Sequence, residues 1–156
     1  MGRKEIKLMK NDESIRANAP LKVLVTGGGG FLGRAIVKLL VERSNDVRSF
    51  SRNLYPELTS MGVEQIQGDI CNKTGIEQAL RGVDLVFHTA AKPGIWGNYS
   101  DYYRTNLTGT QNVIAGCKKH NISRLIYTSS PSVVFNGTDM EGVNESVHYP
   151  ATYHAH

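Results

Sequence analysis

The sequence predicts an α/β domain in which a parallel sheet, of strand order 3-2-1-4-5, carries helices on both faces. Three observations lead to this prediction. Short apolar runs rich in β-branched residues alternate with stretches of helical periodicity, which favours parallel strands joined by right-handed crossovers. Four consecutive glycines follow the first apolar run, where a strand must turn into a helix. The length of 156 residues, 40% of them hydrophobic, suits one domain with a substantial core.

The first half of the domain is read from its turn residues and its apolar spacing. Apolar or alternating runs bounded by Gly, Asn, Asp and Pro predict strands over residues 22–26, 46–51 and 63–67. A helix begins at Phe31, and Pro56 precedes a short helical turn over residues 57–61. An i, i+4, i+7, i+8 spacing predicts the core-facing side chains of the first helix to be Leu32, Ile36, Leu39 and Leu40.

The second half continues the alternation. Asn72 is a plausible N-cap for a helix over residues 72–81. Two further strands are predicted over residues 84–88 and 123–129, on either side of a long helix over 99–120. The inward face of that long helix is predicted to hold Tyr103, Leu107, Ile114 and Cys117. After the fifth strand the chain is expected to be irregular.

The chain divides unevenly. Residues 1–20 are polar, lack an apolar period and end at Pro20, so a mobile leader is expected there, with the folded domain over 21–156. The net charge is +4, and residues 1–22 carry +3 of it. Basic residues are not clustered with aromatic ones, which argues against a nucleic-acid surface.

The composition excludes several other classes. No apolar run approaches the ~20 residues of a membrane span. Two cysteines are too few for a disulfide framework and favour a reducing, cytoplasmic setting. His148, His154 and His156 lack a neighbouring carboxylate or cysteine at ligand spacing, so no metal site is expected.

The glycine-rich turn carries the main functional signal. Gly27, Gly30 and Gly33 are three residues apart between the first strand and the first helix. Gly27 allows a tight turn, Gly30 allows the backbone to approach a pyrophosphate, and Gly33 allows close packing of helix on sheet. The N–H groups at the helix start then bind phosphate. This spacing predicts a Rossmann-type dinucleotide-binding domain.

The ligand of such a sheet lies over the carboxyl ends of its strands, so the residues after each strand are candidates. After the second strand, Ser51 and Arg52 replace the acidic residue typical of NAD sites and suit a 2′-phosphate, so NADP is preferred over NAD. The alternative is that Arg52 is only a surface charge. After the third strand, Asp69 can accept from the adenine amino group while the Ile70 backbone reads the ring edge, unless Asp69 is only a turn residue.

The fourth and fifth strands add two further groups. Ala90 and Ala91 are small enough for a ribose and pyrophosphate to pass near the backbone, and the cation of Lys92 follows them. Hydroxyls at Ser129 and Ser130 follow the fifth strand and could hold a substrate carbonyl or alcohol. Such hydroxyls also occur in turns, where they bond to the local backbone.

Five motifs together resemble one enzyme superfamily. They are T-G-G-G-G-F-L-G, G-D-I, H-T-A-A-K, Y-Y-R-T-N-L-T-G-T-Q-N-V and Y-T-S-S-P-S-V. The chain resembles the extended short-chain dehydrogenase/reductases, within the NAD-dependent epimerase/dehydratase superfamily, and specifically the 3β-hydroxysteroid dehydrogenase-like branch. The stretches S-R-N-L-Y-P-E-L-T-S-M-G-V and A-A-K-P-G-I-W-G-N-Y are most similar to bacterial 2-alkyl-3-oxoalkanoate reductases of long-chain olefin biosynthesis.

The resemblance implies a role for each matching position. The pyrophosphate loop would be Gly27, Gly30, Phe31, Leu32 and Gly33. The adenine contacts would be Asp69 and Ile70, and the segment beside the ribose and nicotinamide would be Ala90, Ala91 and Lys92. Asn106 matches the helix asparagine on the cofactor side, and Ser130 matches the catalytic serine, with Ser129 as its competitor.

The family mechanism also needs a Tyr-x-x-x-Lys pair, which the 156 residues do not contain. We therefore expect a form truncated before its acid/base pair and before the sixth strand. The resemblance implies an NAD(P)-dependent oxidoreductase that transfers hydride to or from a hydrophobic 3-oxo or 3-hydroxy substrate, a 2-alkyl-3-oxo acid or a sterol-like compound. It also implies a possible homodimer. The alternatives are a nucleotide-sugar epimerase or dehydratase and a non-catalytic NAD(P)-binding protein.

Overall fold

The computed structural model describes residues 19–94, 96–138 and 140–150. Its strands are β1 (Lys22–Thr26), β2 (Asp46–Ser51), β3 (Glu64–Gln67), β4 (Leu85–His88) and β5 (Arg124–Tyr127). Its α-helices are α1 (Phe31–Glu42), α2 (Pro56–Ser60), α3 (Lys73–Ala79), α4 (Tyr99–Tyr102) and α5 (Thr110–Lys119). A π-helical segment, η1 (Tyr103–Gly109), joins α4 to α5, and a 3₁₀ turn, η2 (Pro131–Val134), follows β5.

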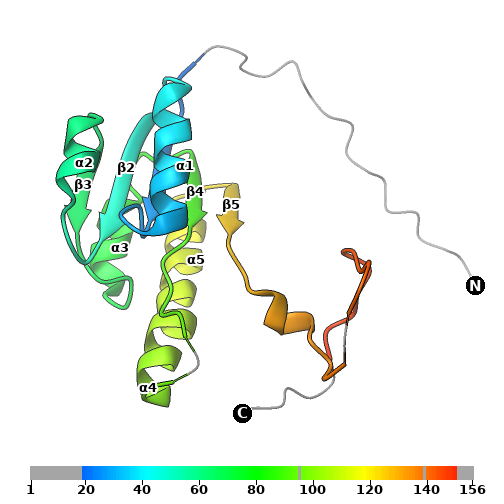
Figure 1. Cartoon of the computed structure of the whole chain (residues 1–156). Coiled ribbons are helices and arrows are strands. Elements are labelled where there is room, and N and C mark those ends of the chain that lie inside the picture. Colours follow the sequence, from blue (N-terminus) through cyan, green and yellow to red (C-terminus); the bar gives the residue numbers. More distant parts are fainter. Residues whose placement is uncertain (1–18, 95, 139, 151–156) are drawn as a thin grey trace, which may run out of the picture.

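The strands form one parallel sheet of order β3-β2-β1-β4-β5, which confirms the predicted fold class (Figure 1). Asn72 caps α3 as predicted, because its side chain accepts a hydrogen bond from the Gly75 N–H. The fifth strand ends at Tyr127, two residues earlier than predicted. Beyond it the chain leaves the sheet and runs away from the folded body (Figure 1).

Buried side chains form a core on each face of the sheet. On one face, Leu24 and Val86 of the sheet pack with Ile76 of α3 and Val113 of α5. On the other face, Val23, Val25 and Val47 pack with Val37 of α1 and Leu58 of α2. Helices therefore cover both faces of the central strands, whereas Ile126 and Tyr127 of β5 are 47% and 51% exposed.

The inward face of α1 differs in part from the prediction, since Ile36 and Leu40 pack against the core as predicted but Leu32 and Leu39 do not. Leu32 and Leu39 are 43% and 53% exposed, whereas Gly33 and Val37 are buried. A Cβ atom on Gly33 would overlap the Gly27 carbonyl, so the helix approaches the sheet most closely at Gly33. This close approach centres the contact face on Gly33 and Val37 and turns Leu32 and Leu39 outward.

The prediction for the long helix is wrong in a similar way. Tyr103, Leu107 and Ile114 are exposed, and of the predicted set only Cys117 is buried. The π-helical segment adds a residue to its turn and so shifts the register between α4 and α5. Gly109 lies so close to the body that a Cβ there would be 2.6 Å from the Ile70 side chain. The face of the long helix that packs on the body is therefore the face that contains Gly109.

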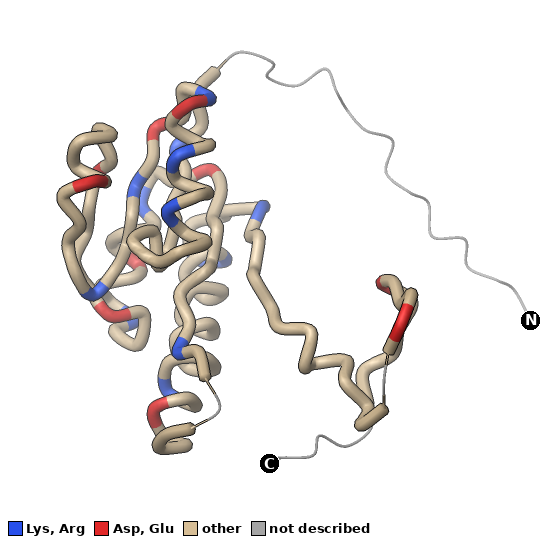
Figure 2. Tube along the Cα trace, in the orientation of Figure 1, with Lys and Arg blue, Asp and Glu red and all other residues tan. Residues whose placement is uncertain are grey.

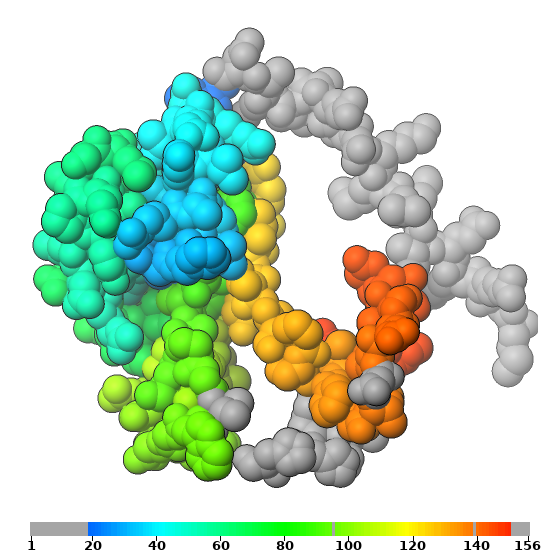
Figure 3. Space-filling view, viewed as in Figure 1, coloured from blue at the N-terminus to red at the C-terminus, as the bar shows by residue number. Residues whose placement is uncertain are grey.

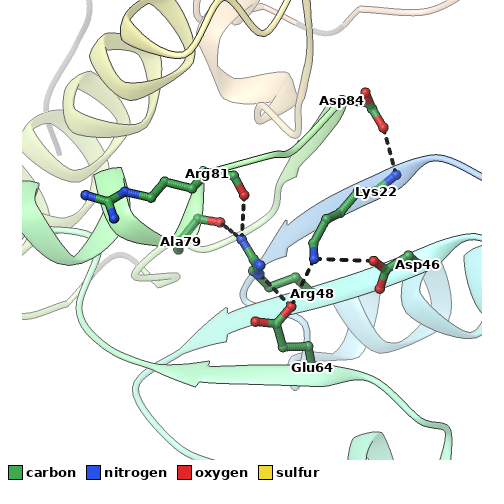
Figure 4. A network of polar contacts seen from close by, with 7 residues as sticks. All are labelled: Lys22, Asp46, Arg48, Glu64, Ala79, Arg81 and Asp84. Atoms are coloured by element: carbon green, nitrogen blue, oxygen red, sulfur yellow. Dashed lines mark hydrogen bonds and ion pairs between the residues drawn. The ribbon is translucent and has the colours of Figure 1, made fainter.

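At the amino edge of the sheet, polar contacts join β1, β2, β3 and the end of α3 (Figure 4). Arg48 is only 8% exposed, and its guanidinium donates to Glu64 (2.9 Å) and to the carbonyls of Ala79 (2.6 Å) and Arg81 (3.0 Å). The Arg48 hydrogen bond lowers the pKa of Glu64, and Lys22 adds a second cation 3.5 Å from the same carboxylate. These contacts tie α3 to the sheet edge far from the carboxyl ends.

Charge is distributed without a dominant sign. Basic and acidic positions are interspersed along the folded body (Figure 2). Every helix in the described part of the chain is too short or too polar to cross a lipid bilayer.

Candidate functional site

A cavity lies at the carboxyl ends of the strands, where the sequence placed the ligand. It is lined by the turns that follow β1, β2, β3 and β4, together with one residue of η1. The lining residues are Gly27, Gly30, Phe50, Ser51, Arg52, Asn53, Tyr55, Gly68, Asp69, Ile70, Thr89, Ala90, Ala91 and Thr105. Eight of the predicted site residues are among them.

The turn after β1 forms one wall of the cavity. Gly27 has a φ of +74°, and a Cβ there would lie 2.9 Å from the Ala90 Cα, so only glycine fits. The Gly30 N–H donates to the Gly27 carbonyl (2.9 Å), which closes the turn at the start of α1. The backbone therefore leaves a cradle without side chains at a helix N-terminus, and such a cradle fits a pyrophosphate.

The end of β2, next to this turn, contributes Ser51 and Arg52 to the lining. The Ser51 Oγ is buried and has no hydrogen-bond partner among the described residues. The Gln67 side chain holds the Arg52 carbonyl (2.9 Å), while the guanidinium forms no ion pair within the described ranges. A hydroxyl and an unpaired cation thus stand together where an anionic or hydroxylated group would be recognised.

Asp69 and Ile70 line the cavity after β3. The Asp69 Oδ1 accepts from the Cys71 N–H (2.9 Å), and this hydrogen bond is the main cause that lowers the pKa of Asp69. Asp69 is therefore an ionised acceptor and also a turn residue, so the two interpretations of the sequence are compatible. The Ile70 carbonyl accepts from Asn112 (3.0 Å), which fixes the backbone beside the cavity.

Ala90 and Ala91 line the cavity after β4, but Lys92 and Asn106 do not. Asn106, in the π-helical segment, instead holds the backbone of Lys92 at both ends. Its Oδ1 accepts from the Lys92 N–H (2.8 Å), and its Nδ2 donates to the Lys92 carbonyl (3.1 Å). The Lys92 ammonium lies 5.1 Å from the centre of the Tyr102 ring. Asn106 therefore shapes the loop that lines the cavity.

A buried histidine joins β1, β4 and α5 through its hydrogen bonds. His88 is fully buried between Thr26 (Nδ1 to Oγ1, 2.6 Å) and Thr110 (Nε2 to Oγ1, 3.0 Å). The Thr110 hydroxyl donates to the Asn106 carbonyl (2.7 Å), so it must accept from His88. His88 is thus protonated on Nε2 and accepts from Thr26 on Nδ1. Burial lowers the pKa of His88 to about 4, which keeps the ring neutral at physiological pH.

Four other predicted residues, Phe31, Leu32, Gly33 and Ser130, lie outside the cavity lining. The side chain of Phe31 is 99% exposed, and that of Leu32 is 43% exposed. The Ser130 Oγ lies 2.8 Å from the Ser132 Oγ and forms the N-cap of η2, as the turn alternative described. Ser129 and Ser130 belong to the segment that projects from the folded body in Figure 3.

Some lining residues were missed by sequence reasoning. Tyr55, Gly68 and Thr105 line the cavity, and His88 and Thr110 form the hydrogen-bonded chain behind it. The Tyr-Pro pair at the start of α2 was the available signal for Tyr55, because Pro56 sets where that helix begins. The contact between His88 and Thr110 joins β4 to α5. The two residues are distant in the chain, so no pattern in the local sequence predicts this contact.

Within the described ranges, no group of three or more His, Cys, Asp or Glu residues could hold a metal ion. His154 and His156 lie outside these ranges. Cys71 and Cys117 are both free thiols.

Comparison with known proteins gives a consistent set of relatives. The model of the 3-beta hydroxysteroid dehydrogenase/isomerase family matches residues 24–156. A 2-alkyl-3-oxoalkanoate reductase of Stenotrophomonas maltophilia is 53% identical over 118 residues, which are 76% of this chain and 36% of that protein. A decarboxylating sterol-4-alpha-carboxylate 3-dehydrogenase of Mus musculus is 39% identical over 128 residues, 82% of this chain and 35% of that protein.

Solved structures show the same fold. The UDP-glucose 4-epimerase of Thermus thermophilus, in complex with NAD, superposes with a TM-score of 0.71 at 28% identity. The match covers 83% of this chain and 44% of the epimerase chain. The chain thus spans little more than a third of the length of the curated relatives named above.

Proposed function

The chain belongs to the 3-beta hydroxysteroid dehydrogenase/isomerase family, and from this premise we propose that it forms the cofactor-binding part of an NAD(P)-dependent oxidoreductase. In this proposal the domain over residues 21–156 holds the dinucleotide, and the reaction interconverts a hydrophobic 3-oxo compound and its 3-hydroxy form. The observation that carries the proposal is the side-chain-free cradle at Gly27 and Gly30, where Gly27 packs against the Ala90 backbone and both line the cavity.

Each residue of the cavity then has a binding role. The helix start at Gly30, Phe31, Leu32 and Gly33 presents backbone N–H groups to the pyrophosphate. Asp69, which is ionised, accepts from the adenine amino group, and Ile70 contacts the ring edge. Ala90 and Ala91 leave space for the ribose, and Asn106 holds Lys92 in place beside the nicotinamide.

A bound nicotinamide would supply or accept hydride at its C4 atom, while a proton moves to or from the substrate oxygen. Ser130 is the proposed residue that holds the substrate oxygen. The proposal places the acid/base pair in a segment that these 156 residues do not contain, because no tyrosine here has a lysine four positions later. The names of the relatives support a 2-alkyl-3-oxo acid or a sterol-like substrate. We also propose a homodimer, which analytical ultracentrifugation would test.

Arg52 and Ser51 support a preference for NADP(H) over NAD(H). Titration calorimetry with NADPH and with NADH tests both parts of the proposal. We expect NADPH to bind more tightly, and Arg52→Ala to remove most of that preference, because the cation is lost from a phosphate site. Arg43→Ala, at the far end of α1, is the matched control and should leave the ratio unchanged. An unchanged ratio in Arg52→Ala would exclude Arg52 as the discriminating residue, and no binding of either cofactor would exclude the function itself.

A nucleotide-sugar epimerase is the second candidate, because the epimerase of Thermus thermophilus shares the fold and was solved with NAD. Tightly held NAD that survives dialysis, or activity on UDP-sugars, would favour this candidate. A non-catalytic NAD(P)-binding protein is the third candidate. It would bind the dinucleotide but show no turnover in the full-length protein.

A further inference from the structure

Tyr55 stands at the edge of the cavity in the loop between β2 and α2. Its backbone is held at two points by one side chain. The Tyr55 N–H donates to the Gln65 Oε1 (2.8 Å), and the Tyr55 carbonyl accepts from the Gln65 Nε2 (3.0 Å). Pro56 starts α2 immediately afterwards. The position of the Tyr55 Cα atom is therefore fixed relative to β3, on which Gln65 lies.

The Tyr55 ring packs directly on the glycine turn. A Cβ atom on Gly29 would overlap three ring carbons, among them Cε2 and Cζ next to the hydroxyl. Gly29 is fixed from its other side, because the Arg34 guanidinium donates to the Gly29 carbonyl (3.1 Å). Arg34 also pairs with Glu57 of α2 (3.3 Å). The phenol end of Tyr55 is thus held against a rigid turn.

Tyr55 shares this part of the cavity with Ser51 and Arg52. Among the described residues, Tyr55 forms hydrogen bonds only through its backbone N–H and carbonyl. Its phenol hydroxyl is therefore available to a ligand. The neighbouring carboxylate of Glu57 is paired with Arg34, so it does not oppose an anion here. Asp69 also lines the cavity, and the charge of Arg52 is near enough to help lower the pKa of Asp69, after the Cys71 hydrogen bond as the main cause.

We propose that Tyr55 is a specificity-determining residue that donates its phenol hydroxyl to the 2′-phosphate of NADP(H), beside Arg52. This inference rests on the proposed cofactor binding and deepens it. Tyr55 supplies the directional hydrogen bond, while Arg52 supplies charge. Gly29 is required to be glycine because any side chain there would displace the phenol.

The test uses two half-ligands that differ only in the 2′-phosphate, 2′,5′-ADP and 5′-AMP. Their dissociation constants are measured by calorimetry on the full chain. Tyr55→Phe should weaken 2′,5′-ADP about tenfold, because a hydrogen bond to a charged group is lost, and 5′-AMP less than about twofold. Tyr99→Phe removes a phenol hydroxyl from an exposed ring on α4, outside the cavity lining, and is the matched control that should change neither constant.

A second variant tests the packing on which the inference depends. Gly29→Ala should also weaken 2′,5′-ADP selectively, because its methyl group displaces the ring, and it should have little further effect in a Tyr55→Ala background. Equal weakening of both half-ligands by Tyr55→Phe, or no change in either, would overturn the role of Tyr55. Tighter binding of 5′-AMP than of 2′,5′-ADP by the unaltered chain would also overturn it while leaving the oxidoreductase function intact. Failure of both half-ligands, NADPH and NADH to bind would overturn the proposed function instead.

Discussion

At the scale of single residues, two glycines show why the same residue type can serve opposite purposes. Gly33 lies where a Cβ would overlap the Gly27 carbonyl, which is backbone and cannot move aside cheaply. Gly75 lies inside α3, where the nearest atom to a Cβ would be 3.6 Å away. Glycine is therefore a requirement at Gly33 and a cost to helix stability at Gly75.

We expect Gly33→Ala to lower the free energy of unfolding by about 1–3 kcal/mol, the range typical of overpacking. Gly75→Ala should instead raise it by about 0.5–1 kcal/mol, because alanine has the higher helix propensity. Urea titration followed by circular dichroism measures both. Equal effects of the two substitutions would show that the helix does not approach the turn as closely as described.

At the scale of elements, the His88 chain holds three parts of the fold together. It runs from Thr26 on β1, through His88 on β4, to Thr110 on α5 and the Asn106 carbonyl in η1. Asn106 in turn holds the loop at Lys92. The position of a cavity wall therefore depends on a histidine that does not line the cavity. The π-helical geometry of η1 fits this arrangement, since such turns recur at functional sites.

This chain predicts a pH dependence of stability. Burial lowers the pKa of His88 from 6.5 to about 4, so below pH 6.5 the unfolded chain takes up a proton that the folded chain binds only near pH 4. The contribution of His88 is complete above pH 6.5 and is lost as the pH falls toward 4, by about 3 kcal/mol in total. Denaturant titrations between pH 6.5 and pH 4 should show that the free energy of unfolding changes less with pH in His88→Gln than in the unaltered chain. Substitution of the exposed His148 by Gln is the control, and a profile for His88→Gln that matches the unaltered chain would refute this role.

At the scale of the whole molecule, the sheet gathers the turns after four strands into one cavity, while the segment after β5 projects away (Figure 1). Binding groups therefore converge, but Ser130 does not join them.

We expect the 156-residue chain to bind NADPH without oxidising it. At a free concentration 100 times the dissociation constant, NADPH should raise the free energy of unfolding by about 2.7 kcal/mol. Thermal unfolding with and without NADPH measures this effect, with ATP, which lacks the nicotinamide half, as the comparison. Consumption of NADPH in the presence of a 2-alkyl-3-oxo acid would contradict the expectation, because no Tyr-x-x-x-Lys pair is present.

Prediction from the sequence succeeded where the signal is local. The glycine spacing predicted the strand-to-helix turn, Asn72 predicted a cap, and the alternation of strands and helices predicted the sheet order. The family resemblance, drawn from short motifs, is confirmed by the family match. The inward faces of α1 and of the long helix were predicted only in part, because apolar spacing shows which side chains prefer burial and not how closely a glycine lets the helix approach.

The sequence by itself thus determined the fold class, the family and the edge of the sheet at which the cavity lies, because each depends on residues close together in the chain. Only the tertiary structure placed Tyr55 on Gly29, joined His88 to Thr110, and left Ser130 outside the cavity. These contacts join segments that are distant in sequence. They depend on how closely helices and turns pack on the sheet, which no local spacing of residues encodes.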